Sequence, residues 1–277
     1  MDLKKTISSA GIVERYFTNA FIMLKNTLAI RIFRMPLFIA VLFQTKEGTS
    51  MRPEVHNEIN SGFEYLKLDR SSKKLICLFH GYGASMHDLF GLHELLDPNE
   101  LVDWIFPNGF LPIDMGFMVS SRAWFPIDMQ ALDEAMRKGT HRDFSNAYNK
   151  DFDHALSQCQ IFFDHIIEGY DEVILGGFSQ GAMITTHLSL RNSDKVSKLL
   201  CLSGTLIGQK ELIPLLEKST KFSFFQSHGK SDAVLGYDSA KMLFELLKLG
   251  SHQGEFVGFD GGHEIPNKVI DKLKKFI

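Results

Sequence analysis

From residue 61 to residue 277, short apolar runs alternate with longer stretches whose apolar residues recur at helical spacing. The apolar runs predict strands at 63–68, 74–79, 102–106, 173–176, 198–202, 222–226 and 255–259. The periodic stretches predict helices at 88–96, 151–167, 180–191, 239–249 and 265–276. Several predicted strands are apolar at nearly every position, as parallel strands covered on both faces are. We therefore predict an α/β fold with a mostly parallel central sheet and helices on both faces.

The connections in this pattern are polar or irregular. Polar residues 69–72 separate the first two strands and predict a hairpin. The longest irregular stretch, 107–128, is rich in proline, glycine and aromatic residues. A long loop of this kind inside a compact domain is usually functional.

The first fifty residues follow a different pattern. Apolar residues form one stripe of a helix, and the segment from 17 to 44 has basic residues but no acidic one: Phe17, Phe21, Leu24, Leu28 and Ile32 make the stripe. Its longest uncharged run, 35–45, is too short for a membrane-spanning helix, which needs about 20 residues. We predict a helical N-terminal extension over 1–52 ahead of one α/β domain over 53–277. Three interpretations of the extension stay open: peripheral membrane contact through 16–43, an arm packed on the core, or sequence upstream of a true start at Met51.

Composition and charge narrow the function. The 277 residues are 44% hydrophobic and 23% charged, which excludes a disordered or fibrous chain. The net charge is 30 − 33 = −3, so a nucleic-acid partner is not predicted. The scattered Cys77, Cys159 and Cys201 form neither a disulfide framework nor a metal motif. We therefore expect no metal and no organic cofactor, and place the protein in the cytoplasm because no clean export signal precedes the domain.

Ser179 is the strongest candidate for chemistry. It stands in Gly177-Phe178-Ser179-Gln180-Gly181, between a predicted strand and a predicted helix. A nucleophilic serine in a sharp strand-to-helix turn has strained backbone, so the residues two positions away on each side must be small. The alternative is a tight turn without chemistry.

The order of residues after Ser179 supports a catalytic triad. Asp232 and His263 each follow a predicted strand, and catalytic groups gather at the carboxyl ends of parallel strands. The order serine, acid, histidine is that of the α/β hydrolases. Two rivals remain: His228 as the base, and Asp260 as the acid. His187, eight residues into the helix, points away from the turn and is interpreted as a packed or surface residue.

The loop after the strand at 74–79 can supply an oxyanion hole. It reads His80-Gly81-Tyr82-Gly83, and the flanking glycines let the Tyr82 N–H turn inward. The other donor is the backbone N–H of Gln180, directly after the nucleophile. A plain glycine turn is the alternative.

These motifs together resemble the phospholipase/carboxylesterase family of α/β hydrolases, which includes acyl-protein thioesterases. The likeness runs from about Gly62 to the end of the chain and includes the loop 121–128. It implies that Ser179 is the nucleophile, His263 the base and Asp232 its orienting acid. It also implies substrate contacts for Trp124, Phe125 and His80.

The resemblance implies a serine carboxylesterase that cleaves small to medium acyl esters without a cofactor. An acyl-protein thioesterase or lysophospholipase acting at a membrane surface is the alternative, and a non-catalytic binding protein of the same fold comes last. The sequence departs from the family at Ala182, where a second glycine is common. That methyl group is expected to be tolerated in the helix but to crowd the strand packing.

Overall fold

The computed structural model describes residues 53–114 and 121–277. The predicted extension over 1–52, including the stretch 16–43, lies outside the described residues. Within the two described ranges, no helix is both long and apolar enough to cross a membrane.

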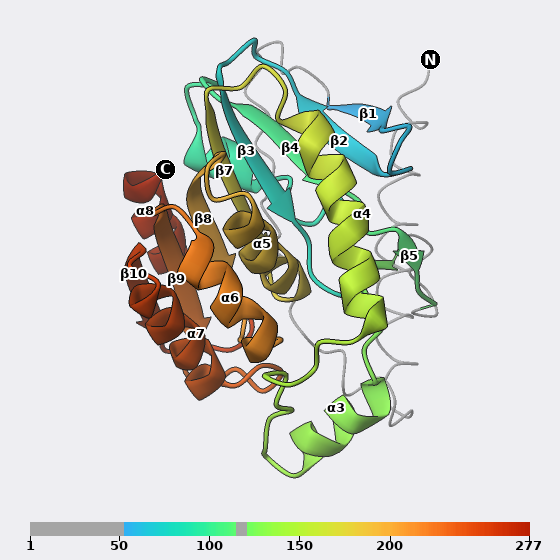
Figure 1. Ribbon diagram of the computed structural model, residues 1–277, viewed down its shortest axis with the longest axis vertical. Helices are drawn as coiled ribbons and strands as arrows, with labels where there is room; N and C mark the ends of the chain where they lie inside the picture. The colour runs from blue at the N-terminus through green and yellow to red at the C-terminus, as the bar shows by residue number, and fades with distance from the viewer. Residues whose placement is uncertain (1–52, 115–120) are drawn as a thin grey trace, which may run out of the picture. The chain divides into compact units, whose positions relative to one another are not determined.

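The described chain forms a large sheet, a small sheet and flanking helices (Figure 1). The large sheet contains β1 (Glu54–Asn57), β2 (Glu64–Leu68), β3 (Lys74–Phe79), β4 (Asp103–Pro107), β7 (Glu172–Phe178), β8 (Val196–Leu202), β9 (Ser223–Gly229) and β10 (Gln253–Phe259). The small sheet pairs β5 (Leu111–Pro112) with β6 (Arg122–Ala123). The helices are α2 (Leu92–Leu96), α3 (Met129–Arg137), α4 (Lys150–Ile166), α5 (Gln180–Arg191), α6 (Gln209–Lys218), α7 (Tyr237–Leu249) and α8 (Asn267–Phe276).

The strand order in the large sheet is β1-β2-β4-β3-β7-β8-β9-β10. All neighbours from β4 to β10 are parallel, whereas β1 and β2 add an antiparallel edge. The prediction of a mostly parallel sheet is therefore confirmed.

The predicted hairpin between the first two strands is wrong, because β4 lies between β2 and β3. β3 is buried along nearly its whole length, so it needs a covered neighbour on each side. The turn instead carries the chain past the start of β4. There, the buried Asp103 carboxylate accepts hydrogen bonds from the Arg70 N–H (2.8 Å) and the Ser72 N–H (3.1 Å).

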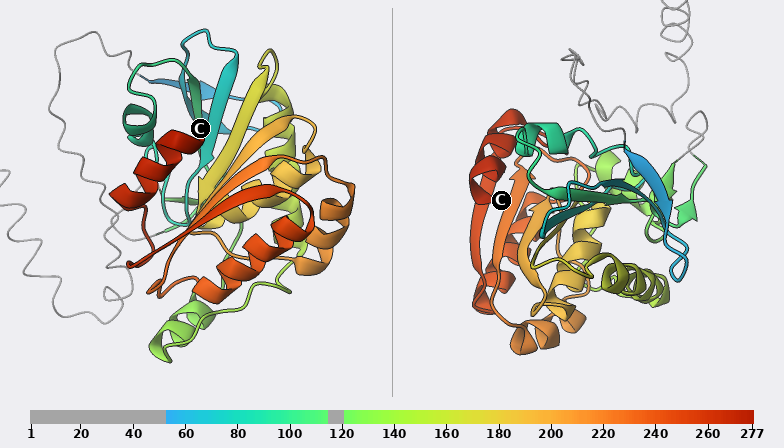
Figure 2. Two further views of the ribbon diagram at one scale, coloured as in Figure 1. Left: turned by 90° about the vertical axis from the view of Figure 1, so that its left-hand side faces the viewer. Right: turned by 90° about the horizontal axis from the view of Figure 1, so that it is seen from above.

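Helices cover both faces of the sheet, and the alternation of side chains along β3 shows why. Leu75, Cys77 and Phe79 pack with α4 and α5 on one face. Ile76 and Leu78 pack with α2 and α8 on the other. Figure 2 shows α2 and α8 on the side of the sheet opposite α4. Because successive strand residues point to opposite faces, a continuous apolar run supplies two cores at once.

The chain changes direction across the sheet between β3 and β7. After β3 it enters α2 on one face and returns to β4; after β7 it enters α5 on the other face and continues to β8. The two strands pair directly, with Phe79 opposite Gly177. Such a switch point leaves a crevice at the carboxyl ends of the strands, where ligands bind in open α/β sheets.

Some elements were absent from the sequence prediction. β1 and the two-residue strands β5 and β6 are too short for a clear pattern. α3 begins directly after the irregular stretch, where the Asp128 side chain caps it by accepting the Ala131 N–H (3.0 Å). α6 contains Pro214, a residue that argues against a helix interior.

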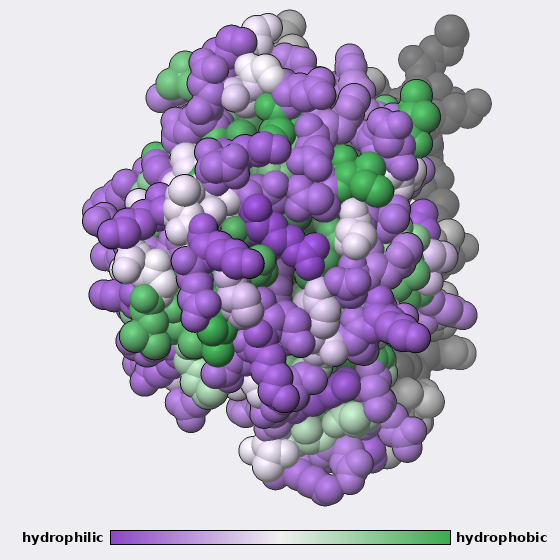
Figure 3. Space-filling view, viewed as in Figure 1, coloured by the Kyte–Doolittle hydropathy of each residue, from purple (hydrophilic) through white to green (hydrophobic). Residues whose placement is uncertain are grey.

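The face covered by α4, α6 and α7 is mostly hydrophilic, with apolar side chains scattered over it (Figure 3). The exposed ones on these helices are Ile161, Ile213, Met242 and Leu249. Isolated apolar residues of this kind are normal on a protein surface and indicate no interface.

Gly204 resolves the crowding expected at Ala182. The Ala182 methyl group is fully buried in α5 and packs beside the end of β8. A Cβ at Gly204 would lie 2.6 Å from the Ala182 Cβ and 2.8 Å from the Cys201 Sγ. The space taken by the methyl group is therefore left free by the glycine after β8.

We expect Gly204→Ala to destabilise the fold by about 1–3 kcal/mol, because either close approach forces a shift in a packed core. Ala182→Gly alone should cost about 1 kcal/mol, since glycine weakens a helix. The double variant should be more stable than the sum of the two effects predicts, because one of the two clashes is gone. Urea unfolding of all four proteins measures this coupling, and strictly additive effects would contradict it.

Candidate active site

Ser179 occupies the turn between β7 and α5. Its backbone has φ 55° and ψ −116°, a strained conformation for any residue with a side chain. Its N–H donates to the Leu202 carbonyl at the end of β8 (2.9 Å). A Cβ at Gly177 would lie 2.5 Å from the Gly181 backbone carbon, so the turn closes only with a glycine there. The strand–turn–helix setting predicted for this serine is present.

The loop after β3 lies against this turn. A Cβ at Gly181 would lie 2.2 Å from the Phe79 carbonyl oxygen, so the first turn of α5 touches the end of β3. A Cβ at Gly81 would lie 3.4 Å from the Ser179 Cβ. The two segments predicted to supply the nucleophile and the oxyanion hole are therefore neighbours.

His80 fixes the shape of that loop through both ring nitrogens. Nε2 accepts the Gly109 N–H (2.9 Å), so the ring proton is on Nδ1, which donates to the Gly81 carbonyl (2.7 Å). Burial lowers the pKa of His80 to about 4, which keeps the ring neutral near pH 7. The tautomer is thus set by the backbone around it.

The Gln180 side chain joins the nucleophile turn to the tryptophan loop. Its Oε1 accepts the Trp124 N–H (2.9 Å), and its Nε2 donates to the Phe125 carbonyl (2.7 Å). The Trp124 indole N–H in turn donates to the His80 carbonyl (2.8 Å). The sequence had indicated only the backbone N–H of Gln180, because nothing in a linear motif marks a side chain that bonds 55 residues away.

Trp124, Phe125 and His80 are covered in this arrangement, with exposures of 0%, 4% and 1%. They hold the loops around Ser179 in place, and their contact with substrate stays a prediction. Tyr82 is partly exposed next to them. Within the described residues, the Tyr82 N–H has no hydrogen-bond acceptor, and the Gln180 N–H stands at the open N-terminus of α5.

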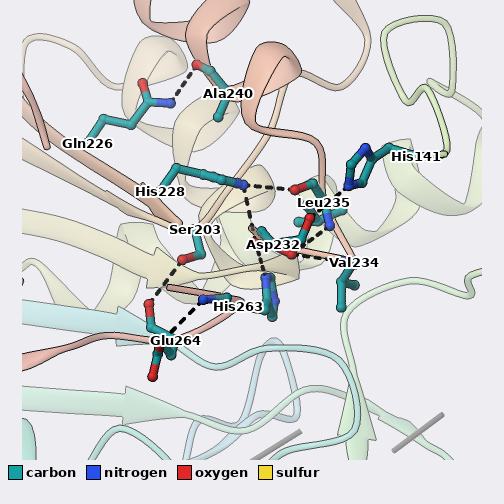
Figure 4. A network of polar contacts seen from close by, with 11 residues as sticks. His141, Ser203, Gln226, His228, Asp232, Val234, Leu235, Ala240, His263 and Glu264 are labelled. Carbon is teal, nitrogen blue, oxygen red and sulfur yellow. Dashed lines mark hydrogen bonds and ion pairs between the residues drawn. The ribbon is translucent and has the colours of Figure 1, made fainter. Parts of the chain in front are cut away.

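Asp232 and His263 come together from the loops after β9 and β10 (Figure 4). The His263 Nδ1 lies 2.6 Å from the Asp232 Oδ2. The His263 ring packs against Phe178, the residue before Ser179, with ring centroids 4.8 Å apart. The Lys230 N–H bonds the Phe259 carbonyl (2.9 Å), which ties the two loops to each other.

The rival acid is elsewhere. The Asp260 side chain is 91% exposed and pairs with the Lys230 Nζ (2.8 Å). His187, as expected, is packed: it is buried in α5, and its Nε2 donates to the Ile207 carbonyl (2.9 Å).

The Asp232 carboxylate accepts three hydrogen bonds and lies close to a fourth N–H group. Oδ1 takes the Val234 N–H (2.8 Å) and the Leu235 N–H (3.0 Å), whereas Oδ2 faces both His263 and His228. Burial alone would raise the pKa of Asp232, but these donors outweigh it and hold the pKa well below its usual range. The carboxylate is therefore charged near pH 7.

Two contacts with Asp232 were not predicted. The His228 Nε2 lies 3.2 Å from Oδ2, and the His141 Nε2 donates to the Asp232 backbone carbonyl (2.7 Å). His228 had been considered only as a rival base. His141 is 91 residues away in the chain and follows α3, so no local pattern could connect it to the site. No group of three metal-ligating side chains is arranged for a metal ion within 53–114 and 121–277.

The fold and this arrangement define the class of protein: an α/β hydrolase with a serine elbow after β7 and an acid–histidine pair in the loops after β9 and β10. The family model described as phospholipase/carboxylesterase matches residues 63–277, and the chain belongs to that family of serine hydrolases.

Two named relatives and one solved structure are similar to this chain. The acyl-protein thioesterase 1 of Candida albicans is 26% identical over 226 residues, covering 75% of this chain and 92% of that protein. The acyl-protein thioesterase 1 of Neurospora crassa is 26% identical over 213 residues, covering 73% and 84%. A carboxylesterase from Mesorhizobium loti has the same fold, with a TM-score of 0.62 and 16% identity over 80% of this chain and 97% of its own.

Proposed function

We propose that this chain hydrolyses carboxylic esters of small to medium acyl groups through Ser179, His263 and Asp232. The observation that carries the proposal is the 2.6 Å contact between His263 and Asp232, in a ring that packs on the residue before the strained Ser179. Nucleophile, base and orienting acid are recognised by such geometry and not by their spacing in the sequence.

The proposed reaction is two-step acyl transfer. His263 takes the proton of the Ser179 hydroxyl while the oxygen attacks the ester carbonyl, and the same ring then protonates the leaving alcohol. Water activated by His263 releases the acid and restores Ser179. Asp232 holds the Nδ1–H tautomer of His263 and stabilises its imidazolium form.

The developing oxyanion is proposed to lie between the Tyr82 and Gln180 N–H groups. Tyr82 lies in the loop after β3 and Gln180 begins α5, and the His80, Trp124 and Gln180 side chains hold these segments together. Preformed donors need no rearrangement when charge appears, and one such donor is worth about 10²–10³ in rate.

A thioester substrate is the second candidate, and the Candida albicans and Neurospora crassa relatives named acyl-protein thioesterase 1 favour it. The same triad serves both, because a thiol leaves more readily than an alcohol. A lysophospholipase at a membrane surface depends on residues 16–43, outside the described structure. The cytoplasm remains the proposed location, supported by three buried free cysteines, Cys77, Cys159 and Cys201.

Turnover of p-nitrophenyl esters from acetyl to palmitoyl tests the proposal, with an S-acylated peptide of matched chain length assayed beside each ester. We expect the best kcat/KM on an ester of short or medium chain. A preference of about tenfold or more for the peptide thioester, roughly 1.4 kcal/mol in the barrier, would reassign the chain as a thioesterase. A folded protein inert on both series would contradict the proposal.

A further inference from the structure

His228 is buried beside Asp232, the acid of the proposed triad, and no step of the proposed reaction uses it. It is the next-to-last residue of β9, and its side chain has no exposed surface. Its Nε2 lies 2.9 Å from the Leu235 carbonyl oxygen and 3.2 Å from the Asp232 Oδ2 (Figure 4). A carbonyl oxygen can only accept, so Nε2 carries the ring proton and donates it to Leu235, with the Asp232 Oδ2 beside that bond.

The other ring nitrogen of His228 fixes this state. Nδ1 is buried and has no hydrogen-bond partner within the described residues. A proton there would be a donor without an acceptor inside the core, so His228 keeps the Nε2–H tautomer. A ring of this kind cannot serve as the proposed base, because it neither reaches solvent nor has a free nitrogen directed at the site.

Two imidazole rings therefore face the same atom, Oδ2 of Asp232. His263 approaches it at 2.6 Å from the loop after β10, and His228 approaches from the core side of β9. Oδ1 is occupied by the Val234 and Leu235 N–H groups. The carboxylate therefore cannot rotate without breaking bonds on both oxygens, and the nearby Nε2–H dipole of His228 stabilises its negative charge.

We propose that His228 is a positioning residue that holds Oδ2 of Asp232 toward His263 and limits how strongly that carboxylate attracts a proton to the His263 ring. This inference rests on the proposed function for its effect on turnover. Its effect on the His263 ring can be measured without turnover.

Other titratable groups lie near His228 and Asp232, and the test variants must leave these groups unchanged. From the loop after α3, His141 donates to the Asp232 carbonyl, not to the carboxylate. From the loop after β10, the Glu264 carboxylate accepts the Gly262 N–H (3.2 Å). Lys230 and Asp260 pair with each other at the surface. From α7, the Tyr237 ring lies 6.1 Å from the His228 ring. Within the described ranges, only His228 and His263 place a ring nitrogen on the Asp232 carboxylate.

The test uses two amide substitutions that differ only in reach. In His228→Gln the amide nitrogen extends about as far as Nε2 and keeps a donor toward Oδ2, whereas in His228→Asn it stops short. Removing the donor leaves more of the Asp232 charge to His263. In the pH profile of kcat/KM, we expect the acidic limb of His228→Asn to lie about 0.5–1 pH unit higher than that of the wild type, and the plateau to be severalfold lower. His228→Gln should restore both the position of the limb and the height of the plateau.

The same shift should appear in the NMR titration of the His263 ring, recorded in the Ser179→Ala background so that no turnover is needed. If His228→Asn does not fold, His228→Phe removes the donor without placing an unpaired amide in the core. A folded Asn or Phe variant with an unmoved limb and an unmoved His263 titration would overturn the inference, as would a Gln variant that behaves like Asn.

Ser179→Ala in the same assays separates this inference from the proposed function. If it abolishes turnover while the His228 variants leave the limb and the titration in place, only the role of His228 is wrong. If it keeps turnover, the proposed triad is wrong. The His263 titration in the His228 variants then still decides whether the two rings share Oδ2.

Discussion

Ser179→Ala is expected to lower kcat on esters by about 10⁴-fold or more, with the fold intact. Without the hydroxyl no acyl-enzyme can form, and only the oxyanion donors and substrate binding remain. The substitution should leave stability nearly unchanged, because the backbone N–H that bonds Leu202 is kept and alanine removes only the side-chain oxygen. Steady-state kinetics and thermal unfolding of the same preparation check both statements.

Ser189→Ala is the matched control for this variant. Ser189 is a buried serine of the same helix, α5, and its hydroxyl has no partner within the described residues. It should keep near-wild-type kcat. The assignment of Ser179 as the nucleophile would be wrong if Ser179→Ala kept normal turnover. It would also be wrong if the control lost as much activity as the Ser179 variant.

Asp232→Asn has the second large expected effect, about 10⁴-fold in kcat, with a loss of stability in addition. Four N–H donors face the two oxygens of this side chain. Whichever way an asparagine amide is turned, its NH₂ group meets two of those donors. The imidazolium of His263 also loses its counter-charge. The Nδ1–H tautomer of His263 is then no longer held in place, and the transition state is less well stabilised.

Asp260→Asn is the control, since that carboxylate is exposed and pairs only with Lys230 at the surface of the described chain. Its kcat should stay within about twofold of wild type, because exposed ion pairs contribute little. Kinetics of both variants, with unfolding curves to confirm folded protein, decide the acid. The opposite ranking, with Asp260→Asn the damaged enzyme, would show that Asp232 has been misassigned.

Much of the fold was readable from the sequence because its signals are local. Parallel strands buried on both faces give continuous apolar runs, and the helices between them repeat at their own period, so β7, α5 and α4 were predicted almost to their ends. β2 and β3 were also found, but their pairing was not, because whether two adjacent strands pair depends on a third strand, β4, that comes later in the chain. α6 was hidden by Pro214, and β5 and β6 are too short to show a period.

Only part of the candidate site, like part of the fold, could be predicted from the sequence. The elbow around Ser179 and the order of Asp232 and His263 could be read from the sequence, because a strained turn demands glycines at fixed positions and catalytic residues gather in the loops at strand ends. The folded chain was needed to show which acid meets His263, that His228 lies beside the same oxygen, and that Gln180 and His80 hold the surrounding loops. Those contacts join residues 4 to 91 positions apart through individual polar contacts. A contact of that kind has a direction and a distance but leaves no period in the chain, so it exists only once the sheet has brought its loops to one edge.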